Sequence, residues 1–383
     1  NVDALGHAFK TIIERHTVLR SIIYSENGTP FQKVMPADNW QLLQFPQATS
    51  DVELKDYINK PFNLKTDFML RAALLQRSNA EFVLAVVVHH IAADGWSMGI
   101  IIKELSAWYN HFANQTPTNI GDLPLQYADY ALWQRQNIVG ELLEQKLAYW
   151  KQKLQRVTPL ELPTDFPRPS VLTTNGATVR ISFGPEISTA LQQLSLKHES
   201  TLFMTMLAAF KVLVYRYTGQ TDITIGTPTA GRAQTELENL IGFFVNTLVL
   251  RDEIYPEVGF DALLANVKQT TLEAFAHQDI PFDKIVEAVV SERDLSRTPL
   301  FQVLFALQNT PESTGLQLGD LELRAKEVTQ TTSKFDLFLN LTQTTEGISG
   351  AIEYNTDLFK QSSIEQMLEH YQRILEQITI DAQ

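Results

Sequence analysis

Two adjacent histidines, followed by an aspartate and a glycine, are the residues whose types and spacing best suit catalysis. They lie in the run Val88-His89-His90-Ile91-Ala92-Ala93-Asp94-Gly95-Trp96-Ser97. Imidazole can take up or release a proton near neutral pH, and glycine lets the backbone approach a ligand closely. A lone histidine is more often structural, but this combination favours catalysis. The candidate catalytic residues are therefore His90, His89, Asp94 and Gly95.

The two histidines are expected to point to opposite sides of the chain. Glu81–Val88 is a predicted strand, and its run Phe82–Val88 is uniformly apolar, which is typical of a strand covered on both faces, so we expect a buried central strand to deliver them. Adjacent strand residues alternate between faces, so the pair cannot easily bind one metal ion. We predict that His90 faces a cleft and acts in catalysis, whereas His89 is largely structural.

The elements around the histidines indicate a mixed α/β fold. Ser97 is placed to cap a helix that runs to about Phe112, which puts the histidines in a strand-to-helix loop. The chain begins with a helical pattern, followed by a hairpin around Asn27-Gly28 and a strand at Phe68–Gln76. The second half predicts strands at 177–183, 222–226, 301–308, 335–342 and 348–354, and helices at 185–198, 201–218, 260–277 and 363–378.

A cluster of four prolines predicts a boundary between two lobes. Periodicity lapses between Gln155 and Thr174, where the chain carries Pro159, Pro163, Pro167 and Pro169. A length of 383 residues also suits two lobes. We therefore predict an N-terminal lobe at 1–155, a linker at 156–174 and a C-terminal lobe at 175–383.

Composition excludes several classes of function. The chain has 31 Lys and Arg against 44 Asp and Glu, a net charge of −13, which argues against binding to nucleic acid. It contains no cysteine, so thiolate metal sites and cysteine nucleophiles are excluded. Its longest apolar runs are far shorter than the roughly 20 residues of a membrane helix, and the N-terminus has no signal pattern. We expect a soluble, cytoplasmic protein.

Six ordered segments resemble the motifs of one enzyme family. His89–Gly95 is similar to the HHxxxDG signature of condensation domains of nonribosomal peptide synthetases, within the chloramphenicol acetyltransferase-like superfamily. The other matches are Arg15–Arg20 to RHxxLR, Tyr127–Trp133 to YxDYAxW, Ile241–Thr247 to IGxFVNT, His277–Asp283 to HQDxPFE, and Arg293–Leu300 to RDxSRxPL. The family's opening SxxQxRxW segment has no match, so we expect a strand position of the first lobe to be empty.

The resemblance implies a fold, a reaction and partners. The fold would be two chloramphenicol-acetyltransferase-like α/β lobes forming a V-shaped pseudo-dimer. The reaction would join a donor aminoacyl or peptidyl thioester to the amine of an acceptor aminoacyl thioester, with an L-configured donor and acceptor. Both substrates would be carried on the phosphopantetheine of upstream and downstream peptidyl carrier domains, beside a neighbouring adenylation domain. The domain itself would bind no cofactor.

The resemblance also implies roles for individual residues. His90 would align the attacking amine and receive its proton, and Gly95 would let the backbone approach the reacting carbonyl. Asp94 would support the site by pairing with Arg15, our first choice, or with Arg20. Trp96, Ser97, Asn246 and Trp150 would line the substrate channel. Independently of the resemblance, the aromatic residues of Tyr127–Trp133 recur at helical spacing, which favours packing over substrate contact.

Two alternative functions stay open. An epimerisation domain would use the same signature for proton exchange at Cα, and a non-catalytic module would only bind carrier or tailoring proteins. A plant-type acyltransferase is disfavoured because a DFGWG segment is absent. A cyclising variant is disfavoured because His89 stands where such domains carry aspartate.

Overall fold

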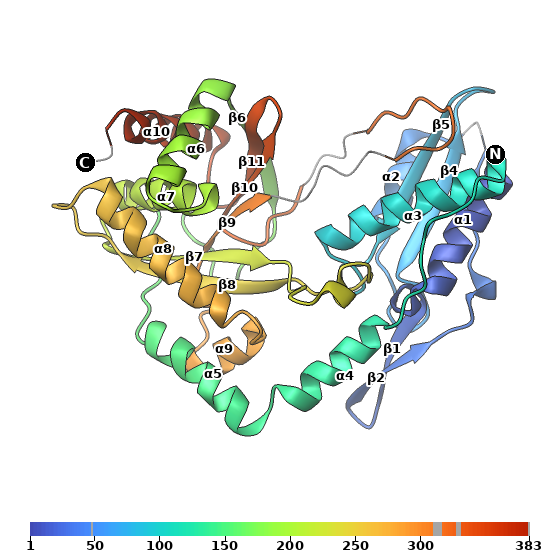
Figure 1. The fold of residues 1–383 in the computed structure, drawn as a ribbon, viewed down its shortest axis with the longest axis horizontal. Coiled ribbons are helices and arrows are strands. Elements are labelled where there is room, and N and C mark those ends of the chain that lie inside the picture. Colours follow the sequence, from blue (N-terminus) through green and yellow to red (C-terminus); the bar gives the residue numbers. More distant parts are fainter. Residues whose placement is uncertain (47–48, 309–315, 327–330, 382–383) are drawn as a thin grey trace. The chain divides into compact units, whose positions relative to one another are not determined.

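The chain folds into two compact units, each assembled from three stretches of sequence. The computed structural model describes residues 1–46, 49–308, 316–326 and 331–381 (Figure 1). Unit 1 comprises Asn1–Asn137, Arg232–Val245 and Thr310–Lys326. Unit 2 comprises Ile138–Gly231, Asn246–Asn309 and Glu327–Gln383. In the described part of the chain, none of the helices combines the length and the apolar composition that a membrane span needs.

This division differs from the lobes predicted at 1–155 and 175–383. Residues 138–174 belong to unit 2, because Leu147, Trp150 and Leu154 are buried in its core. Residues 232–245 and 310–326 belong to unit 1, although they follow the proline-rich stretch. A change in local periodicity marks an irregular segment, whereas long-range packing decides the unit to which that segment belongs.

Unit 1 combines helices with two small sheets. Its elements are α1 (Val2–Arg15), η1 (Thr17–Arg20), β1 (Ser21–Glu26), β2 (Thr29–Val34), η2 (Ala37–Asn39), β3 (Leu43–Phe45), α2 (Asp51–Asn59), β4 (Leu70–Gln76), β5 (Phe82–Val88), α3 (Gly95–Asn114), α4 (Tyr127–Asn137) and η3 (Thr235–Leu237). Strands β1 and β2 form the predicted hairpin, with Asn27 and Gly28 at positive φ in its turn. Apolar residues of α1 and α3 are buried in one core with residues of β4.

The strand that leads to the histidines is not the buried central strand that the sequence predicts. The three-stranded sheet has the order β3-β4-β5, so β5 lies at its edge and β4 at its centre. Most of β4 is buried, whereas most residues of β5 are partly exposed and Phe82 is exposed. Apolar, β-branched residues favour a strand, but they do not specify how many neighbours it has.

Unit 2 is built on a six-stranded sheet with the order β6-β11-β10-β9-β7-β8. The strands are β6 (Gly176–Phe183), β7 (Asp222–Thr229), β8 (Asn246–Glu253), β9 (Val303–Gln308), β10 (Leu337–Thr344) and β11 (Gly347–Asn355). The helices are α5 (Gly140–Lys153), α6 (Pro185–Lys197), α7 (Leu202–Thr218), α8 (Phe260–Ala276), α9 (Phe282–Val289) and α10 (Gln361–Ile380). Strand β9 pairs in parallel with β7 and β10, and the remaining pairs are antiparallel.

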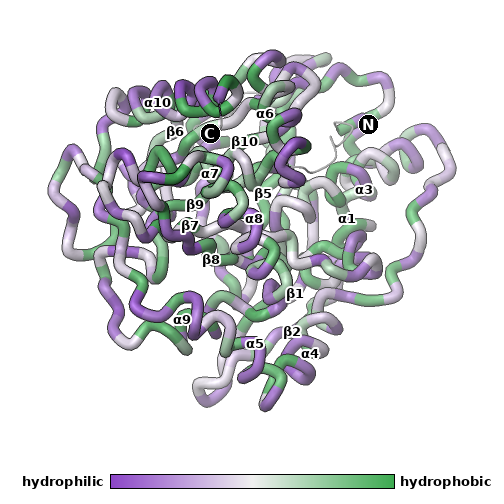
Figure 2. Tube along the Cα trace, turned by 60° about the vertical axis from the view of Figure 1, so that its left-hand side comes forward, coloured by the Kyte–Doolittle hydropathy of each residue, from purple (hydrophilic) through white to green (hydrophobic). Residues whose placement is uncertain are grey.

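The core of unit 2 follows from helical and strand periodicity. Along β10, Leu337, Leu339 and Leu341 are buried in alternation with more exposed residues. In Figure 2, α10 alternates between hydrophilic and hydrophobic residues, as expected for a helix with one face on the core. Its buried residues are Ile364, Met367, Leu368, Tyr371, Leu375 and Ile378. The mixed α/β class predicted from the sequence is confirmed.

Candidate active site

The histidines lie in a short loop between β5 and α3. Asp94 is the N-cap of α3, and its Oδ1 accepts a hydrogen bond from the Ser97 backbone N–H at 2.9 Å. The expectation that Ser97 caps this helix is therefore wrong. The helix begins at Gly95, two residues earlier than Ser97, because an aspartate is an equally good N-cap and lies closer to the end of the strand.

His90 has one ring nitrogen fixed by the loop. Its Nδ1 lies 2.8 Å from the carbonyl oxygen of Ala93, which can only accept, so Nδ1 carries a proton, and in the neutral ring the lone pair is on Nε2. The side chain is exposed, and its ring meets the ring of Phe243 edge to face at a centroid distance of 5.1 Å. This tautomer gives His90 an Nε2 that can accept a proton or a hydrogen bond from a substrate.

The ring of His89 makes different contacts from that of His90. Its Nδ1 accepts the backbone N–H of Ile91 at 3.0 Å, and its ring packs edge-on against Phe62 at 5.4 Å. Partial burial, with a smaller effect of neighbouring His90, lowers the pKa of His89. The neutral His89 side chain therefore stabilises the turn in which His90 lies.

Asp94 is buried and its cationic partner is Arg232. The Arg232 Nη1 lies 2.8 Å from Oδ2 of Asp94, and Nη2 lies 3.2 Å from Oδ1. The Phe244 backbone N–H also donates to Oδ2 at 3.0 Å, and the Ser97 hydroxyl donates to Oδ1 at 2.8 Å. Burial on its own would raise the pKa of Asp94, but Arg232 and the Ser97 donors lower it below its usual range.

The predicted pairing of Asp94 with Arg15 or Arg20 is wrong. Arg15 Nε lies 3.1 Å from Glu104, and Arg20 donates to backbone carbonyl oxygens, including Met35 at 2.6 Å. Glu104 lies ten residues along α3 from Asp94, which is about 15 Å of helix. Because Arg15 ends α1 beside that later part of α3, it cannot reach the start of the helix.

The pair between Arg232 and Asp94 is part of a buried network that holds residues 232–245 on the loop. Ser97 is fully buried, and its Oγ lies 2.9 Å from Gly242 O and 3.0 Å from Arg232 Nη2. The expectation that Ser97 lines a channel is therefore wrong, since its hydroxyl is used inside the protein. Gly242 has to be glycine, because a Cβ there would lie 2.2 Å from the Tyr127 ring.

Tyr127 holds the same segment from another side. Its hydroxyl donates to the carbonyl oxygen of Phe243 at 2.9 Å, and its ring meets Phe244 edge to face. Burial, with smaller effects of Tyr130 and Asp94, raises the pKa of Tyr127 to about 12, so the hydroxyl stays a donor at neutral pH. The segment Tyr127–Trp133 therefore positions a neighbour of His90 through its first residue.

The three other residues predicted to line the channel are Trp96 in unit 1 and Asn246 and Trp150 in unit 2. Trp96 is partly exposed, and its Nε1 donates to Glu238 O at 2.9 Å. Asn246, in unit 2, stabilises the loop that contains Gln278 and Ile280, because its side-chain amide donates to Gln278 O at 2.8 Å and to Ile280 O at 2.7 Å. Trp150 is fully buried in the core of unit 2, so the expectation that it lines a channel is wrong.

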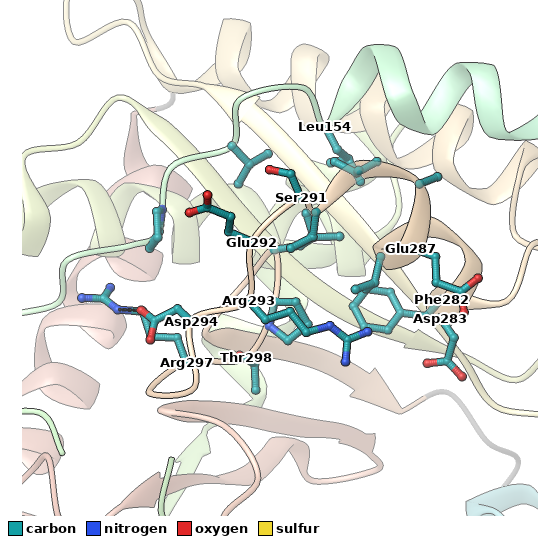
Figure 3. Close-up of a pocket in the computed structure, with 18 of the residues that line it drawn as sticks. Leu154, Phe282, Asp283, Glu287, Ser291, Glu292, Arg293, Asp294, Arg297 and Thr298 are labelled. Carbon is teal, nitrogen blue, oxygen red and sulfur yellow. Dashed lines mark ion pairs between the residues drawn. The ribbon is translucent and has the colours of Figure 1, made fainter. Parts of the chain in front are cut away.

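Two motif segments meet in unit 2, at a pocket of about 1200 Å³ that contains none of the predicted site residues. Figure 3 shows Phe282 and Asp283 from one segment and Arg293, Asp294 and Arg297 from the other, with an ion pair between Arg297 and Asp294. Both segments shape this pocket. Within the described ranges, no three His, Asp or Glu side chains group as a metal site.

Three residues of the site were not assigned to it from the sequence. Tyr127 and Phe243 lie in segments that carried the family resemblance, so a signal existed but did not indicate contact with the histidine loop. Arg232 follows Gly231 in a polar stretch and has no local feature that marks it as the partner of Asp94. The pairing depends on a sequence separation of 138 residues.

Fold and site together define a mixed α/β protein with a histidine on a strand-to-helix loop, and comparison with known proteins identifies the family. The condensation-domain family model matches residues 1–383, and the chain belongs to this family. It is 44% identical over 392 residues to a linear gramicidin synthase of Brevibacillus parabrevis, covering 99% of the chain and 8% of that protein. Malpinin synthetase of Mortierella alpina is 38% identical, with 100% and 5% covered. The chain thus spans less than a tenth of these relatives.

Solved structures show the same fold. The X-domain from teicoplanin biosynthesis, solved as a complex with OxyB, superposes with a TM-score of 0.88 at 28% identity, over 100% of this chain and 86% of that one. The epimerisation domain from the third module of tyrocidine synthetase B superposes with a TM-score of 0.77 at 18% identity, over 99% and 88%. At that identity the second likeness concerns the fold alone.

Proposed function

We propose that the chain forms a peptide bond between a donor thioester and the α-amine of an acceptor, with His90 as the catalytic residue. The observation that carries the proposal is the hydrogen bond that fixes Nδ1 of His90 and leaves Nε2 available on an exposed ring. Its Nδ1 proton is held by Ala93 O, and its Nε2 lone pair lies on an exposed side chain. Family membership supports the same reaction, since homologous chains belong to peptide synthetases.

The reaction needs little basicity from the protein. An α-amine titrates near pH 7.7, so roughly a sixth is already neutral at pH 7. His90 Nε2 accepts a hydrogen bond from this amine and aligns it with the thioester carbon. The new C–N bond forms as a tetrahedral adduct, the amine proton passes to Nε2, and the C–S bond then breaks. The thiolate that leaves takes up the proton.

Gly95 supports close approach of the substrate. A Cβ added at Gly95 would meet no protein atom within 4 Å, and the residue is exposed at the start of α3. The space that a side chain would fill is therefore open to a ligand. Its position one residue after Asp94 places this open backbone beside the loop that carries His90.

The substrates are proposed to arrive on the phosphopantetheine arms of an upstream and a downstream carrier domain, next to an adenylation domain. We propose an L-configured donor and acceptor, and no cofactor held by the domain itself. These partners are expected because the relatives are much longer chains in which this sequence corresponds to 5–8% of the length.

One comparison favours a second candidate function. The X-domain that this chain resembles was solved as a complex with another protein, OxyB. A docking module of that kind would need the surface of the domain but no proton acceptor. The ordered tautomer of His90 and the buried support of Asp94 are features that catalysis requires and docking does not.

A carrier-to-carrier assay separates the candidates. The chain is mixed with a donor carrier loaded with an L-aminoacyl group and an acceptor carrier loaded with a second one, and each carrier is then measured by intact mass spectrometry. Condensation predicts a dipeptidyl acceptor carrier. Chiral analysis of the released amino acid detects epimerisation, which would contradict the proposal if it occurred without peptide. Binding of carriers without either product would favour a docking module.

A further inference from the structure

Phe243 is an exposed aromatic residue between two buried ones. Its side chain is 39% exposed, whereas Gly242 and Phe244 on either side are buried. Its ring stands at 88° to the His90 ring, with 5.1 Å between centroids. An apolar ring at the surface beside a catalytic imidazole is open to contact with whatever binds at that imidazole.

The backbone of Phe243 is fixed relative to His90. The Tyr127 hydroxyl holds the Phe243 carbonyl, and the backbone N–H groups of Gly242 and Phe244 donate to Ser97 at 3.1 Å and Asp94 at 3.0 Å. Asp94 and Ser97 belong to the start of α3, directly after the loop that carries His90. The two rings are therefore anchored to the same small group of residues.

An acceptor bound at His90 would bring its side chain to this ring. An amine that hydrogen-bonds to Nε2 lies about 3 Å from it. Its Cα is about 1.5 Å further, and Cβ is one more bond away. The Phe243 centroid is 5.1 Å from the His90 centroid, a spacing comparable to this reach, so an acceptor side chain directed towards Phe243 would contact its ring.

We infer that Phe243 is a specificity-determining residue that favours acceptors with apolar side chains, an inference that rests on the proposed condensation activity. Phe243 would contact the acceptor and not the donor, because the acceptor nitrogen is the atom that binds His90. Burying apolar side-chain surface against the exposed ring stabilises the bound acceptor, and a glycine acceptor gains none of this contact.

The test compares acceptors within each variant. Peptide formation is measured with one donor carrier and with acceptor carriers loaded with glycine or leucine, for the wild type and for Phe243→Ala. We expect the leucine-to-glycine ratio of kcat/KM to fall about 10-fold in Phe243→Ala, through KM more than kcat, the size usual for a lost apolar contact. Phe243→Leu should restore part of the ratio.

A matched control is Phe82→Ala, which removes a ring that is 44% exposed at the far end of β5 in the same unit. Its ratio should equal that of the wild type. An unchanged or higher ratio in a folded Phe243→Ala enzyme that still forms peptide would overturn the inference. Failure of the wild type to form peptide with either acceptor would instead overturn the proposed function.

Discussion

Arg232 binds Asp94 through two hydrogen bonds, of 2.8 and 3.2 Å, although 138 positions separate the two residues in the chain. Their side chains are 1% and 4% exposed. The pair joins the segment Arg232–Val245 to the start of α3, so it holds Phe243 beside His90.

Breaking this pair should destabilise unit 1. Either Asp94→Ala or Arg232→Ala leaves a buried charge without its partner, at a cost of roughly 3–5 kcal/mol. Chemical denaturation of the two single variants and the double variant gives the coupling energy. We expect the double variant to lose much less than the sum of the single losses, and additive losses would contradict the pairing.

Asp94→Asn should lower the free energy of unfolding, but by less than Asp94→Ala does. Both carboxylate oxygens accept hydrogen bonds, Oδ2 from Arg232 and Phe244 and Oδ1 from Ser97 and Arg232. An amide keeps one acceptor, and its NH₂ group then faces donors. A variant as stable as the wild type would show that the second oxygen is dispensable and would reopen a direct chemical role for Asp94.

Replacing His90 with alanine should abolish most peptide formation while leaving the fold intact. The variant loses the Nε2 acceptor, and we expect a fall in rate of at least about 10²-fold in the carrier-to-carrier assay. His7→Ala is the matched control, because His7 is also exposed and lies in the same unit on α1. Turnover of His90→Ala close to that of the control would remove His90 from the mechanism.

His89 should contribute to stability in a pH-dependent way. Its pKa is lowered from 6.5 in the folded state, so the unfolded chain binds a proton more readily. The stability that the neutral side chain contributes is present above about pH 6.5 and is lost as the pH falls towards the folded pKa. We expect His89→Gln to show a shallower loss of unfolding free energy between pH 7 and 5, measured by urea titration, than the wild type. Equal slopes would contradict this.

Arg15 should be coupled to Glu104 and not to Asp94. The Arg15 Nε lies 3.1 Å from Glu104 Oε1, where His16 Nε2 also binds at 3.1 Å. Stability losses at distant sites add within about 0.5 kcal/mol, whereas residues in one network couple by more. Two double-mutant cycles, Arg15→Ala with Glu104→Ala and Arg15→Ala with Asp94→Ala, should therefore give coupling only in the first.

The local elements of this fold could be predicted from the sequence. The strand predicted at 335–342 and the helix predicted at 363–378 lie within a few residues of the observed bounds of β10 and α10. The pair Asn27-Gly28 identified the hairpin turn, because few other residues adopt positive φ at low cost. The order of motifs along the chain was enough to suggest the family that comparison then established.

Tertiary structure decided which of these elements are neighbours. The run Phe82–Val88 is apolar whether it lies at the centre or at the edge of a sheet, and only the order β3-β4-β5 places it at the edge. As far as charge is concerned, Asp94 could be neutralised equally well by Arg15, Arg20 or Arg232. Only the return of Arg232–Val245 to unit 1 brings Arg232 to Asp94, while the packing of α1 on α3 directs Arg15 to Glu104. Side-chain type and spacing set what a residue can do chemically, but contacts between distant segments depend on the packing of whole elements, which local sequence does not encode.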